Sequence, residues 1–141
     1  MKTLLNRSFL ADTHALIWHM IDSPRLSPAA KAIFAEADRG EAIIYLSIIS
    51  PIEIIYLTEK GKLPVELWRT VQRLLEGDLP SKSYQIVDIT WKLASSLERV
   101  PYRSVPDLPD RLIAATALSL GVPLITRDQR LRDWKGIESL W

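Results

Sequence analysis

Four carboxylates occupy positions where the chain passes from an apolar strand, or from a loop, into a helix. They are Asp12, Glu53, Asp110 and Asp128. Carboxylate oxygens are the ligands that hard divalent cations prefer, so these residues could hold Mg²⁺ or Mn²⁺. Such an ion leaves coordination positions for substrate phosphate, and a water activated by the metal can hydrolyse a phosphodiester. The chemistry that this set of residues indicates is therefore metal-dependent phosphoester hydrolysis.

Other residue types that carry chemistry are scarce, and their scarcity excludes most rival mechanisms. The chain lacks cysteine, which removes thiol nucleophiles, disulfides and cysteine-ligated metal centres. Its two histidines, His14 and His19, are five residues apart instead of the four that align two ligands on one helix face. The glycines are too dispersed to form a phosphate-binding loop. Carboxylates and hydroxyls remain as the reactive groups.

Each of the four acids also has a purely local explanation. Asp12 could cap the helix that follows it, although a charge placed after so apolar a strand is costly unless it is used. Glu53 could close a capping box with Ser50, in which Pro51 takes the first helical position. Asp128 could cap a short final turn. Local sequence therefore leaves the metal site plausible but open.

The third acidic segment, Asp-Leu-Pro-Asp, contains two candidates. We expect Asp107 to cap the next helix and Asp110 to be the metal ligand. Asp110 could also serve only as a favourable charge in the first helical turn. We therefore predict that Asp107 supports the site and is not a metal ligand.

Glycine, proline and apolar periodicity predict the elements that must position these residues. Strands are expected at 9–11, 42–47, 85–89 and 123–126. Helices are expected at 13–20, 28–39, 51–60, 64–76, 90–100 and 108–120. This alternation predicts an α/β fold, with a parallel sheet of four to five strands and helices on both faces. Functional residues of such sheets gather beyond the carboxyl ends of the strands, where the acids are placed.

The chain length limits the architecture. A chain of 141 residues allows one domain, so residues 1–141 are expected to form it, with 1–8 as an irregular N-terminal extension. The longest apolar stretch is well short of the ~20 residues needed to span a bilayer, and no signal-peptide pattern is present. A cytoplasmic protein without membrane contact is the default prediction.

The net charge of +1 identifies no partner, so contact with nucleic acid must depend on a local basic patch. Arginines flank the third and fourth acidic segments, where they could contact RNA phosphates without reading sequence. They are Arg103, Arg111, Arg127, Arg130 and Arg132. A solvated charged face explains the same arginines equally well.

Four short segments, in order along the chain, contain the four acids. They are 10–18 (LADTHALIW), 47–54 (SIISPIEI), 107–117 (DLPDRLIAATA) and 124–128 (LITRD). In this order they resemble the motifs of the PIN-domain family, and more narrowly of its VapC-type toxin ribonucleases. The resemblance implies a metal-binding tetrad of Asp12, Glu53, Asp110 and Asp128, with Thr126 positioning a carboxylate or a water. The segment 104–109 departs from the family pattern, which leaves the role of Asp107 open.

The resemblance also implies a function and partners. We expect a Mg²⁺- or Mn²⁺-dependent endoribonuclease, the toxin of a type II toxin–antitoxin pair, with RNA as substrate, a cognate antitoxin and a homodimeric state. The helices at 51–60 and 64–76 are the expected antitoxin surface. A non-catalytic RNA- or protein-binding module on the same scaffold is the alternative. A phosphatase with Asp12 as nucleophile is a distant third, because His14 stands where a second aspartate would be needed.

Overall fold

Short apolar segments form a parallel sheet with the strand order β3-β2-β1-β4-β5. The computed structural model describes residues 7–76 and 82–141. The strands are β1 (Ser8–Ala11), β2 (Ile43–Ser47), β3 (Tyr84–Val87), β4 (Leu124–Ile125) and β5 (Ser139–Leu140). Each predicted strand is present with shifted ends, and β5 is an addition at the edge of the sheet.

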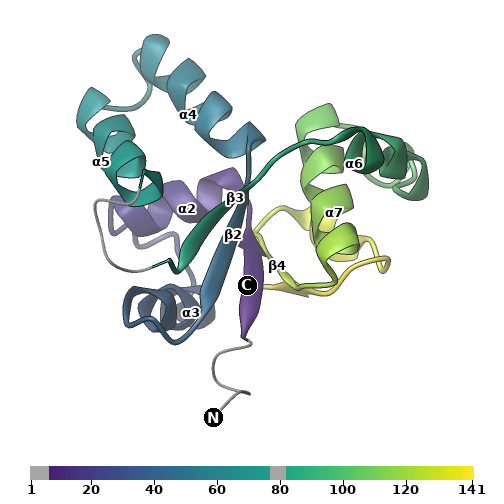
Figure 1. The fold of residues 1–141 in the computed structure, drawn as a ribbon, viewed down its shortest axis with the longest axis horizontal. Helices are drawn as coiled ribbons and strands as arrows, with labels where there is room; N and C mark the ends of the chain where they lie inside the picture. The colour runs from purple at the N-terminus through teal and green to yellow at the C-terminus, as the bar shows by residue number, and fades with distance from the viewer. Residues whose placement is uncertain (1–6, 77–81) are drawn as a thin grey trace.

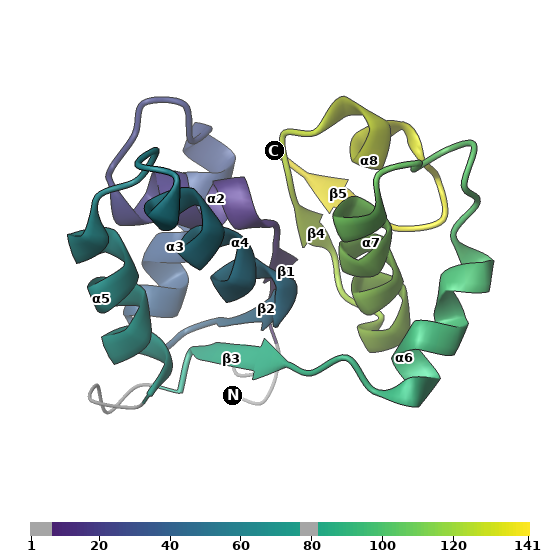
Figure 2. The same cartoon turned by 90° about the horizontal axis from the view of Figure 1, so that it is seen from above.

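Helices cover both faces of this sheet (Figure 1). One face carries α2 (Thr13–Met20), α3 (Pro28–Asp38), α4 (Ile49–Glu59) and α5 (Val65–Leu75). The other side holds α6 (Trp91–Ser95), the 3₁₀ turn η1 (Ser96–Arg99), α7 (Leu108–Leu120) and the short α8 (Gln129–Asp133) (Figure 2). The protein is thus a single α/β domain, as predicted. Within the described ranges, no helix has the length and apolar character to cross a membrane.

Side chains alternate along the central strands and so build two apolar cores. Phe9, Ala11 and Ile125 pack into the core beneath α2–α5. Leu10 and Leu124 point the opposite way, into the core beneath α7. Successive side chains of a strand face opposite sides of a sheet, which explains why these short strands read as continuous apolar runs.

The strand order reverses between β1 and β4. β2 and β3 extend the sheet on one side of β1, whereas β4 and β5 extend it on the other. Ala11 is in register with Ile125, and the next backbone N–H, that of Asp12, donates to Ile125 O at 3.1 Å. A crevice forms at such a reversal because the flanking connections leave over opposite faces of the sheet. The chain segments that leave β1 and β4 therefore border this crevice.

The start of α4 corrects one prediction. The helix begins at Ile49, and its N-cap residue Ile48 makes no side-chain capping bond, so the predicted capping box of Ser50 and Glu53 is wrong. The Ser50 hydroxyl instead lies 2.9 Å from the Thr13 hydroxyl on α2. Pro51 is tolerated because the first helical residues have no intrahelical acceptor for an N–H.

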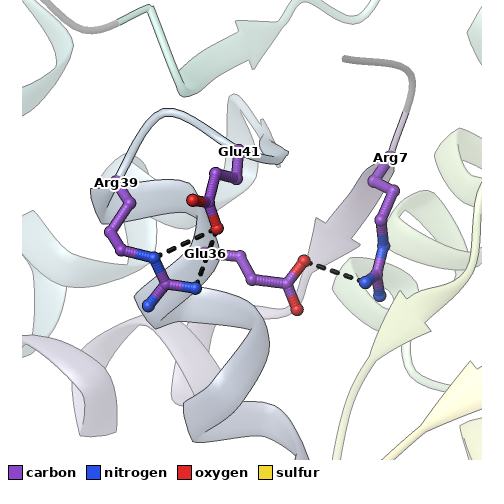
Figure 3. A network of polar contacts seen from close by, with 4 residues as sticks. All are labelled: Arg7, Glu36, Arg39 and Glu41. Atoms are coloured by element: carbon purple, nitrogen blue, oxygen red, sulfur yellow. Dashed lines mark hydrogen bonds and ion pairs between the residues drawn. The ribbon is translucent and has the colours of Figure 1, made fainter. Parts of the chain in front are cut away.

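Two further boundaries differ from the prediction. The helix expected at 90–100 is shorter, since α6 gives way to η1 at Ser96. The predicted irregular extension at 1–8 lies outside the described residues at 1–6, whereas Ser8 already belongs to β1. Arg7 pairs with Glu36 of α3 at 2.9 Å, and a separate pair of Arg39 and Glu41 lies next to it (Figure 3). These exposed or half-exposed pairs contribute little to stability.

Candidate active site

Asp12 lies where the strand order reverses and is fixed by two hydrogen bonds. Its Oδ1 accepts from the Ala15 backbone N–H at 2.8 Å and so caps α2, which is the local role that the sequence left open. Its Oδ2 accepts from the Thr126 hydroxyl. The residue is only 8% exposed, and this burial raises the pKa of its carboxyl group against the opposing effects of the two hydrogen bonds and of His14. A charge buried this deeply is retained only where it is compensated.

Thr126 connects the ends of β1 and β4 through one hydroxyl. The hydroxyl donates to Asp12 and accepts from the Asp128 backbone N–H at 3.0 Å. Thr126 is fully buried, so these two contacts satisfy a polar group that has no access to water. The orientation of Asp12 and the path of the chain into Asp128 are thereby coupled.

Glu53 is oriented by a threonine that the sequence did not single out. The Thr13 hydroxyl donates to Glu53 Oε1 at 2.5 Å. Because Thr13 has one hydroxyl proton, the Ser50 hydroxyl must donate in the 2.9 Å contact between the two. Thr13 and Ser50 thus position Glu53 at the junction of α2 and α4. Both hydroxyls are in the motif segments, which was the available signal.

The first turn of α7 carries Asp107 and Asp110 in different roles. Asp107 Oδ2 accepts from the Asp110 backbone N–H at 3.2 Å and caps the helix, as predicted. Among the described residues, nothing donates a hydrogen bond to the Asp110 carboxyl group. Burial raises its pKa to about 7, with further contributions from the charges of Asp128, Asp107, Asp12 and Glu53. Asp110 therefore lies within the electrostatic field of every other acid of the predicted site.

Asp128 is the most exposed of the four acids. Its Oδ1 accepts from the Leu131 backbone N–H at 3.0 Å and caps α8. Within the described residues, its Oδ2 accepts no hydrogen bond. Asp128 thus combines a local capping role with a position beside Asp12 and Asp110, whose pKa values its charge raises.

The donor set fits a hard divalent cation held through few direct contacts. None of the four ion pairs found in residues 7–76 and 82–141 involves Asp12, Glu53, Asp110 or Asp128. Across the same ranges, no three His, Asp or Glu side chains form a ready-made metal cage. Mg²⁺ commonly uses only one or two carboxylates and completes its shell with water and substrate phosphate. Burial and the neighbouring negative charges together raise the pKa of Asp110, and such a cation would neutralise these charges.

The predicted arginines divide into two groups. Arg103, Arg127 and Arg130 are exposed, and Arg132 is half-exposed. Arg111 instead turns into the fold, where its Nη2 donates to the carbonyls of Leu97 and Val100, both at 3.0 Å. Its guanidinium joins the end of η1 to α7, so Arg111 leaves the set of RNA-contact candidates as a correction.

Replacing Arg111 with alanine is expected to destabilise the protein by about 1 to 3 kcal/mol, because the carbonyl of buried Val100 loses its guanidinium donor and that of Leu97 keeps only the Val100 N–H. Urea unfolding measures the change. The matched control Arg103→Ala removes an exposed arginine and should shift the free energy of unfolding by less than about 0.5 kcal/mol. Equal stability of the two variants would contradict the structural role.

The comparison with known families gives the class of the protein. The PIN domain family model matches residues 9–136, which is most of the chain. The chain belongs to the PIN-domain family, and the resemblance indicated by the four acidic segments is confirmed.

Individual relatives agree with this membership. The chain is 33% identical over 128 residues to Ribonuclease VapC22 of Mycobacterium tuberculosis (strain ATCC 25618 / H37Rv), covering 88% of this chain and 89% of that protein. The fold is similar to a chain of VapBC2 from Rickettsia felis bound to a promoter DNA fragment (TM-score 0.68, 15% identity, 94% and 97% of the two chains). It is also similar to a chain of a toxin-antitoxin complex from Klebsiella pneumoniae (TM-score 0.60, 25% identity, 91% and 93%).

Proposed function

We propose that the protein is a divalent-metal-dependent endoribonuclease and the toxin of a type II toxin–antitoxin pair. The observation that carries the proposal is the placement of Asp12 at the strand-order reversal, with Glu53, Asp110 and Asp128 inside one electrostatic neighbourhood. The ribonuclease named among its relatives and the toxin-antitoxin complex named among similar structures support it. RNA is the proposed substrate.

Asp12, Glu53, Asp110 and Asp128 would hold the metal, which we take to be Mg²⁺ or Mn²⁺. A bound ion of this kind supplies an activated water and neutralises charge on the phosphate. The protein's own residues orient the carboxylates: Thr126 fixes Asp12, and Thr13 fixes Glu53. The exposed Arg103, Arg127 and Arg130, with Arg132, are the proposed RNA contacts, since arginine binds phosphate through its planar fork of donors.

The proposal includes a cognate antitoxin bound to α4 and α5. Ile52, Ile55 and Tyr56 are exposed on α4, and Val65 is exposed at the start of α5. Grouped apolar side chains on adjacent helices are typical of a protein-binding surface. The proposal also includes a homodimeric state. It includes a cytoplasmic location, because the toxin must reach cellular RNA.

Metal-dependent cleavage is the test of this function. The purified protein is incubated with structured RNAs in Mg²⁺ or Mn²⁺, with and without excess chelator. We expect cleavage only with metal, and loss of cleavage in Asp12→Asn, which cannot accept the Thr126 hydrogen bond through its amide nitrogen. Cleavage that survives chelator or this substitution would overturn the mechanism. RNA that is bound but left intact in Mn²⁺ would favour the non-catalytic alternative.

A further inference from the structure

The indole of Trp18 is the centre of an aromatic cluster next to the acids. Trp18 lies on α2, six residues after Asp12. The Trp141 ring meets it edge-on at 5.7 Å between centroids, and the His14 ring lies 5.8 Å away. Trp141 follows β5, and Figure 2 shows the C-terminus between α2 and α8. The half-buried indole is thus fixed by contacts from both ends of the chain.

Two guanidinium groups lie over this indole. The Cζ atom of Arg127 is 5.7 Å from the Trp18 ring centroid, and that of Arg25 is 6.0 Å away. Both arginines are exposed, and neither guanidinium forms an ion pair or hydrogen bond with any residue in the described ranges. Stacking on an aromatic face orders the plane of a guanidinium and leaves its N–H donors available.

Arg127 has an obvious alternative partner that it does not use. In the chain it stands between Asp128 and Thr126, whose hydroxyl donates a hydrogen bond to Asp12, so the carboxylates of Asp12 and Asp128 are its alternative partners. A guanidinium paired with either carboxylate would neutralise the acids that the proposed metal requires. Its position over Trp18 keeps the positive charge beside the acids but apart from them. The Arg127 guanidinium is therefore free to bind an anion other than these carboxylates, such as a phosphate group.

We propose that Trp18 holds Arg25 and Arg127 as a subsite for the phosphodiester backbone of a single-stranded RNA segment that flanks the cleaved bond. This inference rests on the proposed function, because it takes RNA as the substrate. Contacts of this type fix the position and direction of a strand without reading its bases. Trp18 is the positioning residue, and the two arginines make the contacts.

The test measures RNA binding as a function of salt in an Asp110→Asn background, which prevents cleavage. Fluorescence anisotropy with labelled oligo(A) and oligo(U) gives the slope of log Kd against log salt. Each phosphate contact to a single strand contributes about 0.7 to this slope. We expect Arg25→Ala and Arg127→Ala each to reduce the slope by about 0.7, equally for both sequences. The control Arg69→Ala removes an exposed arginine of α5 and should leave the slope unchanged.

A second set of variants isolates the role of Trp18. Trp18→Leu should weaken binding and lower the salt slope although both arginines remain, whereas Trp18→Phe keeps an aromatic face and most of the affinity. Adding Arg127→Ala to Trp18→Leu should reduce affinity by less than the product of the single effects. A purely structural role of Trp18 would not produce this non-additivity. Thermal unfolding of each variant verifies that the fold is intact.

The outcomes separate the subsite from the proposed function. Unchanged slopes in both arginine variants, with a parent protein that binds and cleaves RNA, overturn the subsite and leave the function in place. Reduced slopes with no cleavage by the parent support the subsite and overturn the nuclease. A parent that binds no RNA overturns both. Tighter binding of a polyglutamate peptide than of RNA with equal charge would assign the cluster to an acidic protein and overturn our inference.

Discussion

Asp110→Asn is expected to lower metal-dependent RNA cleavage by at least about 100-fold while it stabilises the metal-free protein. Asparagine supplies a weaker metal ligand, but it also removes a charge whose burial, together with repulsion by the neighbouring acids, raises the pKa of Asp110 to about 7. Removal of this buried, repelled charge should increase the free energy of unfolding by about 1 to 2 kcal/mol, which discounts the full shift because the carboxyl group is partly exposed to solvent.

Because Asp110→Asn should lower RNA cleavage and raise the stability of the metal-free protein, it tests whether the acids share one site. Cleavage is measured with saturating Mn²⁺, and urea unfolding is measured with excess chelator. Asp133→Asn is the matched control, since Asp133 is an exposed carboxylate whose hydrogen bond with Gln129 lies within α8. It should alter both quantities very little. Unfolding of Asp110→Asn at equal or lower urea concentration than the parent would show that the acids do not share a site.

The apparent affinity for Mn²⁺ is expected to fall about tenfold for each pH unit below about 7 and to level off above it. In the metal-free protein a proton occupies Asp110 below this pKa, and the cation must displace it. Isothermal titration calorimetry between pH 5.5 and 8 measures the effect, and Asp110→Asn should remove most of it. A flat affinity profile in the parent would contradict the prediction.

The same titration predicts how metal-free stability depends on pH. Asp110 has a raised pKa in the folded state, so its contribution is fully present below the ordinary carboxyl pKa and is lost as the pH rises to about 7. His19 acts in the opposite direction, because burial lowers its pKa despite the nearby Asp38. Protonation of His19 therefore destabilises the fold on acidification. The difference between the parent and Asp110→Asn isolates the Asp110 contribution.

Features that depend on neighbours along the chain were predictable from the sequence. Asp12, Asp107 and Asp128 all cap helices through bonds to N–H groups three residues ahead. Apolar runs identified the strands because both faces of a parallel sheet are covered. The gathering of the acids followed from one rule, that the carboxyl ends of parallel strands share an edge.

Features that depend on distant partners were not predictable. Ser50 has the local pattern of a capping residue, yet its hydroxyl partner Thr13 lies on another helix. Arg111 is of the residue type that contacts phosphate, but its guanidinium donates to the carbonyls of Leu97 and Val100 at the end of η1. β5 contains two residues, which is too short for an alternating pattern. For Ser50 and Arg111, tertiary packing selected one of several hydrogen-bonding partners that the side chain allowed.

The position of β1 at the middle of the sheet determines when the proposed chemistry can begin. Asp12 is synthesised before its partner Thr126, which directly follows β4 and lies 114 residues further along the chain. Until β4 pairs with β1, Asp12 lacks this hydrogen bond and the nearby charge of Asp128. A nascent chain that has not yet reached β4 and Asp128 therefore lacks part of the proposed set of acids, and we expect it to have no nuclease activity until β4 pairs with β1.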